Sequence, residues 1–223
     1  MEWHNTLYSE RYDDKREPTS DPLHRRYFLL QSRIVGPIFS KVFSGGAAGG
    51  NRYKHLIEPE VTISRTTSFD NSNIIMLENN DFVYGDTTRV TYGITQRLLA
   101  KRGTRAGAQD LLSVQLSQSY YTNKNASTVD GNYGTAYLGR KPDHFSPLTL
   151  AVRTNPSEAY SGTLRVEYHD RRGQFESISA DGSVRLTSWL RTGGSYSQVK
   201  YLTEETEEAE ETEETKSPYT TFL

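Results

Sequence analysis

Two long alternating stretches run in succession between Thr88 and Tyr121 and constrain the fold most. In the first, apolar side chains at Val90, Tyr92 and Ile94 alternate with polar ones. The second, 111–121, repeats the pattern. Side chains on a strand point to opposite faces with period two, so each half predicts a strand with one apolar and one polar face. Ordinary strands have about 5–6 residues, whereas a tilted strand that crosses a bilayer needs about 9–11. We therefore predict a transmembrane β-hairpin.

Similar alternation recurs along most of the chain. Residues 3–11 and 219–223 are expected to be partial strands, and Gly36-Pro37 is expected to bend or bulge the segment 27–43. Pro59 argues against regular pairing on one side of 53–64. Tight turns are predicted at DRRGQ and at RTGGS, 191–195, and long loops at 12–25, 65–86, 122–146 and 203–218. The prediction is an all-β antiparallel barrel segment, with about eight full strands plus two partial ones, long outer loops and short periplasmic turns.

The composition is consistent with a β-barrel that has a water-filled interior. The apolar fraction is 34%, low for a dry globular core. With 15 Tyr and 8 Phe, disorder is a poor account of the whole chain. Residues 204–216 hold eight Glu and one Lys, and we expect a disordered acidic loop over 203–218 within a single partial barrel domain, 1–223. There is no cysteine and no run of 18 apolar residues.

A soluble β-sandwich is the plain alternative, because its strands also alternate. Long strands, mid-strand arginines and aromatics near strand ends favour the barrel. We predict a lumenal face and a lipid-facing one. The lumenal candidates are Lys54, Glu58, Glu60, Arg89, Arg97, Arg153, Arg165, Glu167 and Arg185. The lipid-facing candidates are Val90, Tyr92, Ile94, Leu112, Val114, Leu116, Leu150, Val166 and Leu186.

No pattern of a catalytic or metal site was found. None of the five His has metalloprotease spacing, and SGGAAGGN lacks the Lys-Ser/Thr of a phosphate loop. The lumenal charges have two interpretations. Either they pair across strands and hydrate the interior, or some basic members meet lipid phosphates or a plug. We predict no enzyme activity, no cofactor and no metal.

Several strings resemble the C-terminal barrel of the LPS-assembly protein family (LptD, OstA or Imp). They are KHLIEPEV at 54–61, VYGDTTRVTYGITQRLLAKR at 83–102, LLSVQLSQSYY at 111–121, SPLTLAVRTNP at 146–156 and FESISADGSVRLTSWLRTGGSYSQVKY at 175–201. The segments WHNTLYSER and HRRYFLLQSRIVGPIFSKVF are also similar to strands of that family.

The resemblance implies a Gram-negative outer-membrane barrel that inserts lipopolysaccharide into the outer leaflet. It implies contact with membrane lipid, with a lipoprotein plug of the LptE kind, and with periplasmic bridge proteins through an N-terminal domain outside this chain. No nucleic-acid partner is expected. Because the start lacks a signal peptide, we expect an internal piece of a longer barrel. The alternative function is a passive structural or pore-forming outer-membrane barrel.

Overall fold

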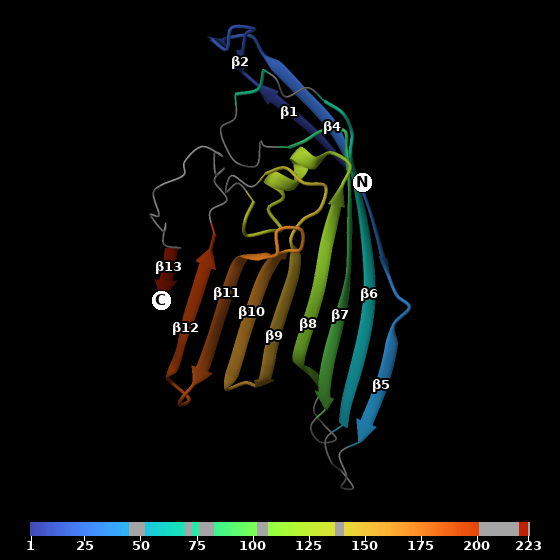
Figure 1. Cartoon of the computed structure of the whole chain (residues 1–223), viewed down its shortest axis with the longest axis vertical. Helices are drawn as coiled ribbons and strands as arrows, with labels where there is room; N and C mark the ends of the chain where they lie inside the picture. Colours follow the sequence, from blue (N-terminus) through green and yellow to red (C-terminus); the bar gives the residue numbers. More distant parts are fainter. Residues whose placement is uncertain are drawn as a thin grey trace.

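The computed structural model describes residues 1–44, 52–69, 73–75, 83–101, 107–136, 141–200 and 219–222. Eleven strands form one antiparallel sheet in the order β1-β4-β6-β7-β8-β9-β10-β11-β12-β13, and β5 also pairs with β6. A curved ribbon of neighbouring strands results (Figure 1). The strands are β1 (Glu2–Tyr8), β4 (Leu23–Val35), β5 (Phe39–Ser44), β6 (Arg52–Thr66), β7 (Thr87–Lys101), β8 (Ala108–Tyr121), β9 (Leu148–Ser157), β10 (Tyr160–His169), β11 (Gln174–Arg185), β12 (Arg191–Val199) and β13 (Tyr219–Phe222).

The prediction of an all-β antiparallel fold is confirmed. If β4 and β5 are taken as one interrupted strand, the sheet has the expected eight longer strands between two short ones, β1 and β13. These two end strands do not pair with each other among the described residues, so the sheet is open there. No helix among the described residues is both long and apolar enough to cross a membrane. The acidic run predicted at 203–218 lies outside the described residues.

β7 and β8, of 15 and 14 residues, pair antiparallel as predicted. Their register is continuous from Arg89↔Tyr121 to Leu98↔Leu112 and then shifts by one residue. Both strands are also paired on their other edges, β7 with β6 and β8 with β9. The predicted hairpin is therefore central in the sheet.

The predicted interruption at Gly36-Pro37 separates β4 from β5, and both strands pair with β6. Val35 lies opposite Glu60 and Phe39 lies opposite Ile57, so three residues on one side of the gap face two on the other. That is the count of a β-bulge. Pro59 lies in this gap and has no Cα partner on β4 or β5, which confirms the irregular pairing predicted on one side of its strand.

The predicted turn at RTGGS is wrong, because 191–195 begins β12. Gly193 and Gly194 pair with Ser183 and Gly182 of β11. A Cβ added at Gly193 would lie 2.7 Å from the carbonyl oxygen of Gly182, so glycine serves close backbone approach there and not a turn. The turn is 186–190, where Leu190 N donates to Thr187 Oγ1 over 3.0 Å.

Two other boundaries differ from the sequence prediction. β4 starts at Leu23, inside the loop expected at 12–25, and that loop also holds the small sheet of β2 (Arg11–Tyr12) and β3 (Pro18–Thr19). The predicted strand around Leu186 ends at Arg185, so Leu186 belongs to the turn.

The connections fall into two groups, because consecutive long strands are antiparallel. At one end lie 9–22, 170–173 and the described parts of 67–86 and 122–147, and we call it the loop end. At the opposite end, the turn end, lie 158–159 and 186–190. The described part 122–136 includes the 3₁₀ helix η2 (Lys124–Val129). The turn predicted at DRRGQ is confirmed by Gly173, whose φ is 64° and whose N–H donates to His169 O.

Candidate functional site

The strand registers sort the predicted site residues onto two faces. Directly opposed residues share a face. Pairings such as Arg97↔Ser113, Ser113↔Arg153 and Arg153↔Thr163 run across β7 to β10. All nine lumenal candidates within the strands lie on this side, which we call the polar face. Pairings such as Ile94↔Leu116, Leu116↔Leu150 and Leu150↔Val166 define the apolar face. It carries every lipid-facing candidate except Leu186, which lies in the turn.

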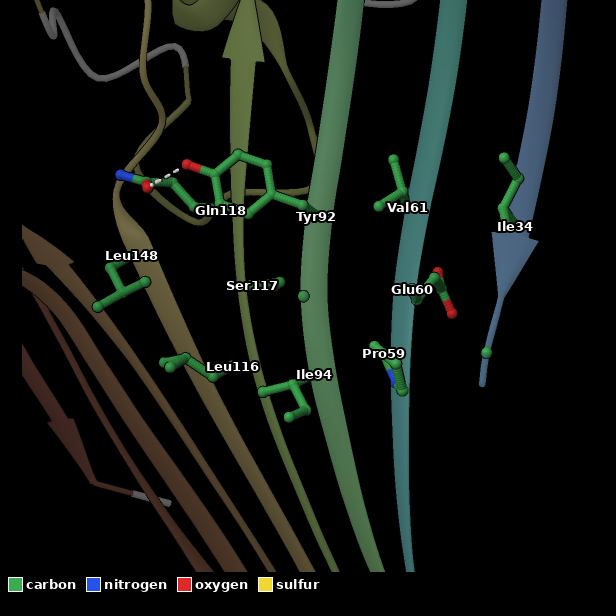
Figure 2. Close-up of a pocket in the computed structure, with 12 residues that line it drawn as sticks. Ile34, Pro59, Glu60, Val61, Tyr92, Ile94, Leu116, Ser117, Gln118 and Leu148 are labelled. Atoms are coloured by element: carbon green, nitrogen blue, oxygen red, sulfur yellow. Dashed lines mark hydrogen bonds between the residues drawn. The ribbon is translucent and has the colours of Figure 1, made fainter. Parts of the chain in front are cut away.

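The apolar face is exposed. Figure 2 shows part of it, where Val61, Ile94 and Leu116 project from neighbouring strands. Side chains of this face remain 36% exposed or more across the sheet; they include Trp3, Phe28, Ile34, Phe39, Val61, Ile63, Tyr92, Ile94, Leu116, Tyr160, Leu164 and Phe175. Soluble monomeric proteins rarely expose so extensive an apolar surface, and where one occurs it usually marks a protein or membrane interaction site.

The polar face carries much of what is buried. Glu167, His169 and Ser119 are each at most 2% exposed. Among the described residues, Leu56 and Ile74 are the only leucine, isoleucine, valine or methionine side chains that are buried. This arrangement is the reverse of a globular protein, in which charged side chains are almost never fully buried and large aliphatic ones usually are.

Ion pairs occupy the polar face toward the turn end. Arg97 pairs with Asp110, and its other guanidinium nitrogen lies 3.9 Å from Glu58. Arg33 pairs with Glu60. Arg185 lies 3.8 Å from Glu158. Lys54 and Arg153 are exposed, and neither forms an ion pair with any described residue. Pairing across strands therefore accounts for several lumenal candidates, although not for these last two.

Toward the loop end, segment 122–136 lies against the polar face and is held at two points. The first is Asp130, whose Oδ2 accepts from Arg89 Nη1 over 2.9 Å and from Tyr121 OH over 2.6 Å. Its side chain is 4% exposed. Nearby, the hydroxyls of Tyr133 and Ser119 are 2.7 Å apart. Burial raises the pKa of Tyr133, so this hydroxyl keeps its proton at neutral pH.

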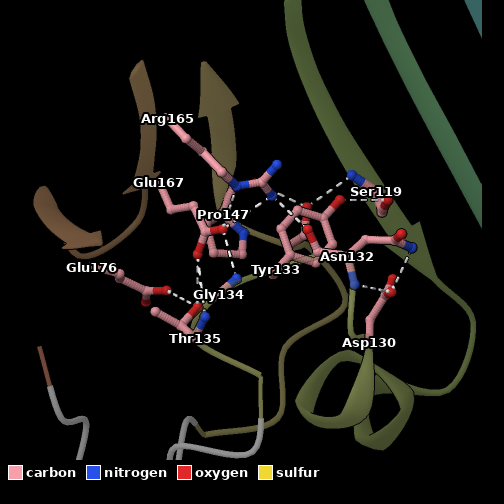
Figure 3. A network of polar contacts seen from close by, with 11 residues as sticks. Ser119, Asp130, Asn132, Tyr133, Gly134, Thr135, Pro147, Arg165, Glu167 and Glu176 are labelled. Atoms are coloured by element: carbon pink, nitrogen blue, oxygen red, sulfur yellow. Dashed lines mark hydrogen bonds and ion pairs between the residues drawn. The ribbon is translucent and has the colours of Figure 1, made fainter. Parts of the chain in front are cut away.

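The second point is Glu167, which is fully buried. Its carboxylate accepts from Gly134 N over 2.7 Å, from Thr135 N over 3.3 Å and from Arg165 Nη2 over 3.1 Å (Figure 3). Thr135 Oγ1 lies 3.2 Å from Glu167 and 3.2 Å from Glu176. Arg165 also donates to the backbone carbonyl of Asn132. Charge-assisted bonds of this kind are the strong ones, so β10 fixes the backbone at 132–135.

Sequence analysis found one partner of each contact and missed the other. The lumenal candidates included Arg89, Arg165 and Glu167, whereas 122–146 was predicted only as a long outer loop. Asp130 and Tyr133 carried one weak signal: an aromatic residue amid the turn-forming string DGNYG. Glu176 and Asp110 lie next to register shifts, where simple alternation gives the wrong face.

The contacts of the polar face therefore hold segment 122–136 in place. Among the described residues, no group of three or more His, Asp or Glu side chains could hold a metal ion. Buried serines such as Ser119 and Ser146 hydrogen-bond within the loop contacts.

A comparison with protein families identifies a match over most of the chain. The sequence model described as LptD, LPS transport system D, matches residues 39–217. That span runs from the start of β5 nearly to β13. None of the curated proteins is similar enough to this chain to count as a match. The chain belongs to the LptD family of the lipopolysaccharide transport system.

Proposed function

We propose that this chain is part of the wall of an outer-membrane β-barrel that delivers lipopolysaccharide to the outer leaflet of a Gram-negative bacterium. One observation carries the proposal: an LptD-family sheet exposes many large apolar side chains on one face and buries several charged ones, such as Glu167 and Glu176, on the other. A barrel in a bilayer needs that inversion, with an apolar band outside and a polar interior.

In this proposal the apolar face meets lipid and the polar face meets a wet lumen. The 10 residues of β9 match the length needed to cross a bilayer at a tilt, and the 15 of β7 exceed it. The loop end faces outward and the turn end faces the periplasm, because outer-membrane barrels have long external loops and short periplasmic turns.

Family membership suggests the partners. Lipopolysaccharide is the cargo, a lipoprotein of the LptE kind is the plug, and periplasmic bridge proteins supply the cargo through a domain outside this chain. The exposed Arg153 and Lys54 on the polar face are available for such contacts. Strands beyond β1 and β13 would pair both free edges, since an unpaired edge in hydrocarbon leaves backbone groups unsatisfied.

Adjacent residues of β8 provide the test of the two faces. Val114 lies on the apolar face and Gln115 on the polar face, so Val114→Arg and Gln115→Arg add the same charge to opposite sides. Arginine on the lipid face near the bilayer midplane costs about 2–4 kcal/mol, whereas lumenal substitutions are tolerated. In cells that depend on the full-length protein, Val114→Arg should reduce the heat-modifiable folded form and Gln115→Arg should not. The opposite order would reverse the assignment of the faces.

Depletion of the full-length protein tests transport. Newly made lipopolysaccharide should then stop reaching the cell surface, where an impermeant label detects it. If surface lipopolysaccharide stays normal while the purified protein conducts ions in planar bilayers, the passive pore is the better account.

A further inference from the structure

A hollow of about 330 Å³ crosses the apolar face near the middle of the long strands. It runs from Ile34 on β4 to Leu148 on β9, and Val61, Ile94 and Leu116 line it between those ends (Figure 2). It therefore crosses the central strands β6, β7 and β8.

The hollow follows from the backbone around it. Gly36 lies at the gap between β4 and β5 and carries no side chain, and Pro59 offers only its compact ring. Gly93 and Ser117, which pair with each other, belong to the polar face and so add only backbone to the hollow. The backbones are close there, because a Cβ on Gly93 would lie 2.7 Å from Leu116 O. Few side chains of the apolar face therefore project into this region, and a hollow remains.

One rim of the hollow is polar but already satisfied. Tyr92 OH donates to Gln118 Oε1 over 2.7 Å, and Gln118 Nε2 donates to Ser146 O over 3.2 Å. Figure 2 shows Tyr92 and Gln118 joined above Ile94 and Leu116. Polar groups bonded in this way face hydrocarbon at little cost. The rim can border an apolar ligand and offers little to water.

We propose that this hollow binds one fatty acyl chain of a phospholipid in the surrounding membrane. The inference rests on the proposed function, which places the apolar face in the bilayer. Four strand spacings separate β4 from β9, or about 19 Å at about 4.8 Å each. Strands that cross a bilayer tilt by about 45°, so a line of about 19 Å across them spans about 13 Å of membrane depth, within the about 15 Å of one leaflet of a core that is about 30 Å thick. A vacant hollow would forfeit dispersion contacts along its lining, and a chain restores them.

Protein partners fit this place poorly. Strand addition needs a free sheet edge, and β6, β7 and β8 are each paired on both sides. A helix is about 10–12 Å wide with its side chains and would span more than two strand spacings, whereas the hollow holds only about 330 Å³. A flexible hydrocarbon chain needs neither backbone partners nor such width.

The experiment uses the full-length protein in nanodiscs of phosphatidylethanolamine and phosphatidylglycerol, doped with a phosphatidylcholine that carries a diazirine midway along one acyl chain. After illumination, mass spectrometry locates the lipid adducts. Adducts should be several-fold enriched at Tyr92, Ile94 and Leu116 relative to Leu164, which lies on the apolar face outside the hollow. Ile94 and Leu164 are both 36% exposed, so exposure alone predicts equal labelling.

Two variants sharpen the test. Ile94→Trp fills the hollow and should bring adducts at Tyr92 and Leu116 down to the level at Leu164, whereas Leu164→Trp should leave the enrichment unchanged. Equal labelling of the whole apolar face would overturn the acyl-chain site while leaving the membrane placement intact. Labelling at Leu164 with none in the hollow would also overturn the site. Absence of adducts from the entire apolar face would instead overturn the proposed function.

Discussion

Replacing Glu167 by glutamine should release segment 122–136 from the polar face. Glu167 is fully buried, and its two oxygens accept from the backbone N–H groups of Gly134 and Thr135. Glutamine keeps one oxygen and turns an NH₂ group toward the second N–H. One buried donor then loses its acceptor, at about 1–3 kcal/mol, and the remaining bonds lose the charge that strengthened them, at about 1 kcal/mol. Docking of the segment should weaken by about 3 kcal/mol.

Hydrogen exchange measures that change directly. Amides at Gly134 and Thr135 exchange when the segment opens locally, and a loss of about 3 kcal/mol corresponds to an exchange rate about a hundredfold higher. Exchange in β7 and β8 should stay the same, because their ladder does not depend on the segment. The measurement uses the full-length protein in nanodiscs.

Glu58→Gln is the matched control. Glu58 lies on the same face, but among the described residues its ion-pair partner is Arg97 at 3.9 Å, and it forms no hydrogen bond or ion pair with segment 122–136. The reasoning is refuted if Glu167→Gln leaves exchange at 134–135 unchanged, or if Glu58→Gln accelerates it equally.

Three further substitutions test other contacts of the sheet and of segment 122–136. Arg89→Met strands the buried Asp130 carboxylate and should cost about 3–5 kcal/mol of local stability; exchange across the segment should recover in part when Asp130→Asn is added. Gly93→Ala forces a methyl against β8, where it would lie 2.7 Å from a carbonyl oxygen, and should cost about 1–3 kcal/mol, seen as a lower temperature of gel-shift unfolding; Gly107→Ala, with open space around it, should not. Burial raises the pKa of Tyr133 above its unfolded value of about 10. The stability that the Tyr133 hydroxyl adds to docking of the segment is therefore complete below about pH 10 and is lost as the pH rises through the folded pKa. Tyr133→Phe should remove this alkaline dependence of amide exchange.

Alternation alone was enough to predict the two faces, because the period of a strand is fixed at two. Arg97 and Glu58 were assigned to one face from separate segments, and the register places them there, 3.9 Å apart. That reasoning fails only where the period breaks. At the register shift between Leu98 and Leu99 it misses Asp110, the ion-pair partner of Arg97.

Local composition was misleading where glycine serves tertiary contact. RTGGS has the residues of a turn, yet Gly194 lies opposite Gly182, which in turn lies opposite Gly162. Glycines therefore lie side by side on three neighbouring strands. This row of glycines is visible only when the partner strands are known, so the segment 191–195 by itself suggests a turn. The docked segment was missed for a related reason: Glu167 is bound by backbone N–H groups, which every sequence possesses.

Two irregularities that sequence analysis treated separately prove to be one feature. Pro59 has no N–H to donate, and its carbonyl accepts from Gly36 N over 2.9 Å. In an antiparallel ladder the N–H and C=O of a residue point to the same neighbour, so the missing donor of Pro59 also faces the gap between β4 and β5. The ladder with β7 therefore loses no hydrogen bond, and Pro59↔Ile94 stays in continuous register. Placing the proline opposite the break confines both defects to one site, and that same site leaves the apolar face hollow.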